Sequence, residues 1–69
     1  GEEAKAKDIM RKLFDYYYSH PDKLPADFIP QLDFDGISRT ICDYIAGMTD
    51  KYAIYTYSEI FIPTAWQVR

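Results

Sequence analysis

The chain lacks the covalent and metal-based devices that stabilise many small proteins. It has 69 residues with one cysteine and one histidine, so no internal disulfide can form and no zinc-ligand spacing is present. Chains of this size bury only about 60% of the surface that their unfolded form exposes. We therefore expect the chain to gain stability by forming a homo-oligomer or by docking on a larger body.

Long apolar runs and an excess of positive charge are also missing. No run approaches the ~20 residues that a membrane span requires, and no signal peptide is found. The net charge is −3, which offers no basic surface for nucleic acid. We therefore expect no membrane partner, this fragment does not indicate a nucleic-acid partner, and the unpaired cysteine fits a reducing cytoplasm.

Aromatic side chains, in contrast, are abundant. They make up 17% of the chain, and seven of them are tyrosines. A tyrosine combines an apolar ring with a hydroxyl that can stay in water, which suits partly buried contact surfaces. This abundance supports the expectation of an interface.

The spacing of apolar residues predicts an all-α fold, a small bundle of three helices. The first helix is expected over residues 2–19, the second over 36–47 and the third over 50–61, because apolar side chains recur there at intervals of three and four. A proline-rich connector at 20–35 joins the first two helices, and a short irregular tail follows the third. Residues 1–69 then form a single helical domain, and the start on glycine rather than methionine indicates a fragment of a longer protein.

The expected core consists of the apolar stripes of these helices. The first helix carries Ala6, Ile9, Met10, Leu13, Phe14 and Tyr17. The second carries Ile37, Ile41, Tyr44, Ile45 and Met48. In the connector, three prolines are expected to stop any helix longer than one turn, while its apolar residues indicate that it lies pinned across the helices.

The boundary between the second and third helices is predicted at Gly47, where a left-handed residue would end a helix. Thr49 can cap the next helix, with Asp50 in its first turn, where the helix dipole favours negative charge. The alternative is one long helix with Gly47 inside it, at a cost of about 1 kcal/mol relative to alanine. Asp35 is the expected cap of the second helix.

Three features invite a chemical interpretation that the residues do not support. His20 has no partner for catalysis or metal binding, so we expect a capping or surface residue. Cys42 lies beside an apolar stripe without a nearby base, which favours a small buried hydrophobe over a nucleophile. The run 33–36 fails as a calcium loop, because Gln31 and Cys42 would take positions one and twelve and neither is acidic. We expect no catalytic residue, no metal site and no cofactor within this chain.

Arg39 and Asp43 are four residues apart and therefore share a helix face. They form either a surface ion pair worth about a few tenths of a kcal/mol or a guanidinium that a carboxylate orients toward an anionic ligand. The residues alone favour the first interpretation. Tyr44, Asp50 and Tyr52 add polar groups nearby with the same ambiguity.

The stretch from Arg39 to Ala53, R-T-I-C-D-Y-I-A-G-M-T-D-K-Y-A, resembles the C-terminal signature of bacterial deoxyguanosinetriphosphate triphosphohydrolase-like proteins, a group of HD-superfamily phosphohydrolases. Lys51 departs from it, since arginine is more frequent there. The resemblance implies a C-terminal accessory domain of an enzyme that hydrolyses dNTPs to deoxynucleoside and triphosphate. In that family a divalent metal, held by a His, His-Asp, Asp set, activates water. That set is missing from this sequence, so we expect the chain alone to be inactive.

The resemblance also implies partners and residue roles. The region would pack on its own HD catalytic domain, close part of the nucleotide pocket and take part in subunit contacts. Arg39 would reach the dNTP with Asp43 orienting it, and Tyr44 and Tyr52 would line or brace the pocket. The turn between the last two helices would be shaped by Gly47, Thr49 and Asp50. The alternative function is a stand-alone helical interaction or dimerisation module without a ligand.

Overall fold

The structure is a computed structural model that describes residues 2–62, and the side chains of residues 5–62. Its helices are α1 (Glu2–Ser19), α2 (Ile29–Asp35), α3 (Ile37–Ala46) and α4 (Asp50–Phe61), with short 3₁₀ turns at Pro21–Lys23 and Ala26–Phe28. The predicted all-α class is confirmed, since the described residues contain no strand. The irregular tail predicted after the last helix lies outside the described residues.

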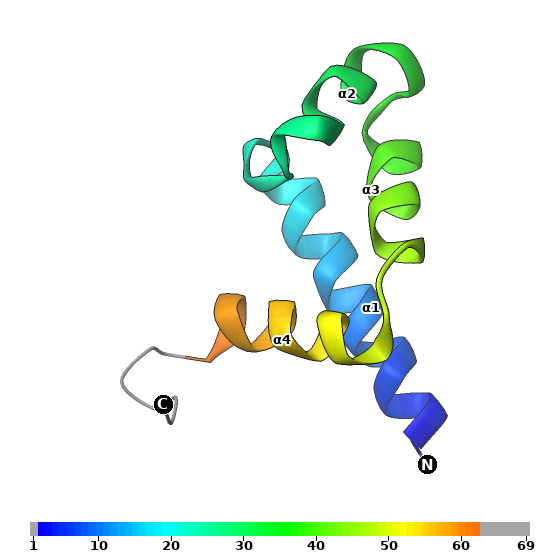
Figure 1. The fold of residues 1–69 in the computed structure, drawn as a ribbon, viewed down its shortest axis with the longest axis vertical. Coiled ribbons are helices and arrows are strands. Elements are labelled where there is room, and N and C mark those ends of the chain that lie inside the picture. Colours follow the sequence, from blue (N-terminus) through cyan, green and yellow to red (C-terminus); the bar gives the residue numbers. More distant parts are fainter. Residues whose placement is uncertain (1, 63–69) are drawn as a thin grey trace.

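The long helix α1 is the element on which the others are assembled (Figure 1). Helices α3 and α4 both pack against it, and α2 packs against α3. The last turn of α4 lies near the end of α1, because the ring centroids of Tyr16 and Phe61 are 6.0 Å apart. None of the helices in the described part of the chain is long and apolar enough to cross a membrane.

The core is small and draws one or two side chains from each contributing segment. Its buried apolar members are Leu13, Tyr17, Leu24, Ile41, Ile45 and Ala53. The predicted stripes of α1 and α3 are confirmed except at Ala6, since these helices supply four of the six while Ala6 is exposed. The hydroxyl of Thr40, which is fully buried, donates to the carbonyl of Gly36 at 2.7 Å. A buried hydroxyl with a partner avoids the cost of an unsatisfied polar group.

The connector departs from its prediction because it contains a fourth helix. The expectation that prolines would stop any helix longer than one turn is wrong for α2. Pro30 lies in the first turn of α2, where its missing N–H is not needed for an intrahelical bond. Asp35 is the last residue of α2 and not the cap of α3. Gly36 takes the cap position, with a φ of 83° and a ψ of 167° that favour glycine.

The predicted break near Gly47 is confirmed, and the single long helix is wrong. Helix α3 ends at Ala46 and α4 begins at Asp50. The hydroxyl oxygen of Thr49 accepts a hydrogen bond from the N–H of Tyr52 at 3.1 Å, as a helix cap should. The predicted left-handed conformation is wrong, since Gly47 has a φ of −82° and a ψ of −4°. Its N–H instead donates to the carbonyl of Tyr44 at 3.3 Å, closing a tight last turn.

Candidate functional site

Arg39 and Asp43 lie one turn apart on the exposed face of α3. Nε of Arg39 donates to Oδ1 of Asp43 at 3.1 Å. The Arg39 side chain is 70% exposed and that of Asp43 is 41% exposed. This exposure follows from the helix itself, because Ile41 and Ile45 turn the opposite face of α3 toward the core.

The second oxygen of Asp43 is held from another helix. Nε2 of Gln31, on α2, donates to Oδ2 of Asp43 at 2.7 Å. The carboxylate is therefore fixed from two sides. Among the described residues, Asp43 is the ion-pair partner of Arg39 and binds it through Nε alone, so the two terminal guanidinium nitrogens can bind an anion. Gln31 was not predicted as a site residue, because nothing in the sequence pairs two residues twelve positions apart on separate helices.

Tyr44 and Tyr52 form a second pair, which bridges α3 and α4. Their hydroxyl oxygens are 3.4 Å apart. The half-buried ring of Tyr44 packs edge-on against Tyr17, with centroids 5.4 Å apart, and at a tilt against Phe28, with centroids 5.1 Å apart. Tyr52 is 46% exposed. Tyr44 therefore braces the pair while Tyr52 presents it to solvent.

Tyr17 and Tyr44 keep their phenolic protons at neutral pH, because both have a raised pKa. Burial raises the pKa of Tyr44 far above its ordinary value, and the hydrogen bond with the Tyr52 hydroxyl raises it further. Burial also raises the pKa of Tyr17. These phenols can donate and accept hydrogen bonds, but they are not bases near neutrality.

The structure thus gathers the predicted site residues into two pairs. Arg39 meets Asp43, and Tyr44 meets Tyr52, while no hydrogen bond or ring contact recorded within residues 5–62 joins one pair to the other. The turn residues lie between α3 and α4, where Thr49 caps α4 as predicted.

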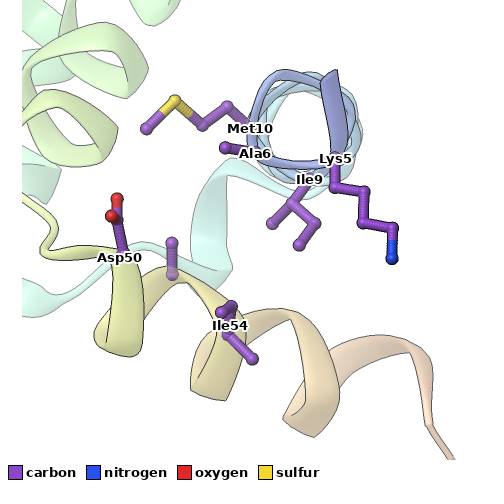
Figure 2. A pocket seen from close by; sticks show the side chains of 7 residues that line it. Lys5, Ala6, Ile9, Met10, Asp50 and Ile54 are labelled. Atoms are coloured by element: carbon purple, nitrogen blue, oxygen red, sulfur yellow. The ribbon is translucent and has the colours of Figure 1, made fainter. Parts of the chain in front are cut away.

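A cavity of about 440 Å³ opens between α1 and α4, away from these pairs (Figure 2). It is lined by Lys5, Ala6, Ile9, Met10, Asp50, Ala53 and Ile54. Asp50 is its one lining residue among the predicted site residues. The sequence could not indicate the cavity, because its walls belong to helices some forty residues apart.

Of the remaining predictions, the one for His20 is confirmed and the one for Cys42 is wrong. His20 is exposed, as predicted, and its Nδ1 lies 3.0 Å from the carbonyl oxygen of Tyr16. Because a carbonyl oxygen can only accept, Nδ1 is the protonated nitrogen of this hydrogen bond. Cys42 was predicted to be buried and this is wrong, since it is exposed. Helix α3 turns Thr40 and Ile41 inward and leaves the next position in water.

No group of three His, Cys, Asp or Glu side chains within the described residues could hold a metal ion. The residues described here therefore do not fit the divalent metal that the resemblance implies for the full-length family.

Comparison with known proteins identifies relatives for most of the chain. The phosphohydrolase-associated domain family matches residues 1–59. A deoxyguanosinetriphosphate triphosphohydrolase-like protein of Caldanaerobacter subterraneus subsp. tengcongensis is 48% identical over 65 residues, which cover 94% of this chain and 19% of that protein. Proteins with the same name from Geobacter metallireducens and Leptospira interrogans are each 41% identical, over 86% and 78% of this chain and 15% and 14% of theirs.

The chain therefore spans less than a fifth of the length of these relatives. No solved structure matches it. The resemblance seen in the sequence from Arg39 to Ala53 is confirmed by the relatives' names and by the extent of the matches.

Proposed function

Because the chain belongs to the phosphohydrolase-associated domain family, we propose that it is the accessory domain of a cytoplasmic dNTP triphosphohydrolase and helps to form its nucleotide pocket. In the full-length protein it packs on an HD domain, which supplies the divalent metal, its ligands and the attacking water. The products are deoxynucleoside and inorganic triphosphate. The shared name of the relatives supports this proposal.

The observation that carries the role of this chain is the two-sided support of Asp43. A carboxylate held by Gln31 and Arg39 cannot rotate freely, so it fixes the plane of the guanidinium. A fixed guanidinium offers two parallel N–H groups to a phosphate and loses little conformational entropy on binding. Arg39 is therefore suited to bind the triphosphate of a dNTP, with Asp43 and Gln31 as positioning residues.

The tyrosine pair complements this cation with neutral hydrogen-bonding groups. A separation of 3.4 Å between the hydroxyl oxygens of Tyr44 and Tyr52 is longer than the 2.5–3.0 Å usual for O–H···O bonds. Such a weak hydrogen bond can readily be replaced by a hydrogen bond from one of these hydroxyls to a ligand. Tyr52, the more exposed of the two, contacts the nucleotide, and Tyr44 braces it from the core.

The test is steady-state kinetics of the full-length protein with Arg39→Ala. Loss of hydrogen bonds to a charged group costs about 1.5–3 kcal/mol, which is about a 10- to 100-fold loss in kcat/KM. The matched control is Arg11→Ala. Arg11 also pairs with a carboxylate on its own helix, Asp8, at 3.0 Å, and its side chain is 74% exposed.

Both variants remove an exposed arginine that pairs with a carboxylate on its own helix, and each carboxylate keeps a second partner, Lys12 for Asp8 at 3.2 Å and Gln31 for Asp43 at 2.7 Å. Equal kinetic constants for Arg39→Ala and Arg11→Ala would contradict the ligand-facing role of Arg39. Absence of triphosphate release from the unsubstituted full-length protein, with dNTP and divalent metal present, would contradict the proposed enzyme as a whole.

One observation favours the alternative, a ligand-free interaction module. Large apolar side chains are exposed on several helices and at the residue after α4, namely Tyr18, Ile29, Phe34, Tyr52, Ile54, Tyr55, Phe61 and Ile62. Where such side chains form a contiguous patch, they mark an interaction site. Self-association that neither dNTP nor the HD domain affects would support the module and count against the accessory role.

A further inference from the structure

The cavity between α1 and α4 is an apolar groove with charged rims, called here the α1–α4 groove. Ala6, Ile9 and Met10 of α1 face Ala53 and Ile54 of α4 across it. Figure 2 shows the side chain of Ile9 directed from α1 toward α4, with Ile54 on the facing helix. Ile54 remains 53% exposed. Such a surface is costly to leave in water.

We propose that the α1–α4 groove receives one amphipathic helix from the remainder of the same polypeptide. The proposal rests on the proposed function in one respect, because it takes the chain to be part of a longer protein. It adds the face through which the accessory domain docks and the chemistry of the segment that docks there.

The relatives extend far beyond the region that this chain matches. The matched region covers 19% of the relative from Caldanaerobacter, so about four-fifths of that protein lies outside it. The described residues bury only six apolar side chains in their core. A domain with so small a core gains stability by covering an open apolar groove with a neighbouring segment.

The size of the α1–α4 groove suits the apolar face of one helix. A volume of about 440 Å³ lies within the range of ligand-sized pockets, about 300–1,000 Å³. It accommodates the apolar side chains that one helix presents at positions i, i+3 and i+4, as in helix-in-groove recognition. A second copy in a two-fold arrangement would place one concave groove against another, and neither would supply a ridge to fill them.

The two rims of the α1–α4 groove carry opposite charges. Lys5 lies on the α1 rim and Asp50 on the α4 rim of the groove, as Figure 2 shows. A helix with an acidic residue on one edge of its apolar face and a basic residue on the other pairs with both rims. Opposite charges on opposite rims also fix the direction in which that helix lies.

Docking at this groove would reach the nucleotide-binding residues through α4. Ala53 and Ile54 face the groove, while Tyr52 on the same helix contacts Tyr44 of α3. A helix seated in the groove holds α4 against α1 and so keeps Tyr52 beside Tyr44. The groove is thus a positioning surface for the proposed pocket.

The test replaces Ile54 of the full-length protein with p-benzoylphenylalanine, a photo-reactive residue, and maps the cross-links by mass spectrometry. The expected result is a cross-link within one polypeptide, to a helix outside residues 1–69. The matched control is the same substitution at Ile29, which is 37% exposed on α2. We expect that photo-reactive residue at position 29 not to form the cross-link that position 54 forms. A cross-link joining two copies, or none at all from position 54, would overturn the proposal.

A second variant tests whether the groove itself is needed. Ala6→Trp fills the groove, so it should abolish the intramolecular cross-link from position 54. Ala46→Trp, an exposed position on α3, should leave the cross-link intact. A cross-link that survives Ala6→Trp would overturn the proposal.

Triphosphate release, measured on the same full-length protein, separates the two proposals. An intact cross-link in a protein that hydrolyses no dNTP would overturn the enzyme and support the docking. Hydrolysis in a protein that forms no intramolecular cross-link would overturn the docking alone.

Discussion

The side-chain amide of Gln31 donates a hydrogen bond to Asp43 at 2.7 Å and thereby ties α2 to α3. The other carboxylate oxygen of Asp43 accepts from Arg39 at 3.1 Å. Exposed ion pairs contribute little to stability. We infer that the main consequence of this arrangement is orientation, because a carboxylate bound on both oxygens keeps the guanidinium of Arg39 in one plane.

Gln31→Glu should destabilise the chain by more than the lost hydrogen bond. The amide contributes about 0.5–1.5 kcal/mol, and its replacement sets a carboxylate against that of Asp43. The added repulsion should fade in 1 M salt, where the Debye length is about 3 Å. Urea unfolding at low and high salt measures this effect. Gln31→Ala is the control, since it loses the bond without the repulsion, and an identical salt dependence for both variants would contradict the contact.

The sequence was sufficient to predict the long elements, because their boundaries depend on local chemistry. The stripe on α1 and the Thr49 cap on α4 are both short-range features, and both are confirmed. The missed helix α2 shows the opposite case. Pro30 looks like a helix breaker in a pattern, but its effect depends on its position within the turn, and only the three-dimensional structure gives that position.

Thr49→Ala should lower the free energy of unfolding by about 1 kcal/mol, the typical value of a helix N-cap. The hydroxyl oxygen of Thr49 accepts from the N–H of Tyr52 at 3.1 Å, and alanine leaves that N–H without its partner. Thr49→Ser is the matched control and should retain most of the stability. Urea unfolding followed by circular dichroism measures both. Equal losses for serine and alanine would show that the hydroxyl does not cap α4.

The two interhelical glycines should respond to alanine in opposite directions. Gly36 has a φ of 83° and a ψ of 167°, a conformation nearly exclusive to glycine, so Gly36→Ala should cost about 1–3 kcal/mol. Gly47 has an ordinary helical conformation, and an added Cβ would lie 3.6 Å from the carbonyl oxygen of Tyr44, an ordinary contact. Gly47→Ala should therefore stabilise the chain by about 0.4–1 kcal/mol.

Urea unfolding midpoints of the two alanine variants give the test. A Cβ at Gly36 would meet no atom within 4 Å, so a loss of stability there reports backbone strain and not a clash. A larger loss of stability in Gly47→Ala than in Gly36→Ala would contradict the helical conformation of Gly47 and support the left-handed conformation that the sequence predicted.

Only part of the candidate site could be predicted from the sequence. Arg39 and Asp43 could be paired in advance because helical spacing places them on one face. Gln31 could not, since its contact with Asp43 depends on how α2 folds back on α3. The α1–α4 groove has the same character, because its two walls meet only through tertiary packing.

Tyr44→Phe should make the chain less sensitive to alkaline pH. Burial, followed by the hydrogen bond with Tyr52, raises the pKa of Tyr44 above its ordinary value of 10.0 in the folded state. A raised pKa means that the folded chain holds this proton more tightly than the unfolded chain does. The corresponding stability is fully present below pH 10.0 and is lost as the pH rises above it. The urea unfolding midpoint should therefore differ less between a pH well below 10.0 and a pH well above it in Tyr44→Phe than in the unsubstituted chain.

Tyr55→Phe is the control for this experiment, because Tyr55 is a tyrosine of α4 that is 61% exposed. It should leave the alkaline loss of stability unchanged. Part of that loss should also survive in Tyr44→Phe, since burial raises the pKa of Tyr17 in the same direction. Combining Tyr44→Phe with Tyr17→Phe should remove more of the pH dependence than either change alone. An alkaline loss that is the same in Tyr44→Phe and Tyr55→Phe would show that the folded chain does not raise the pKa of Tyr44.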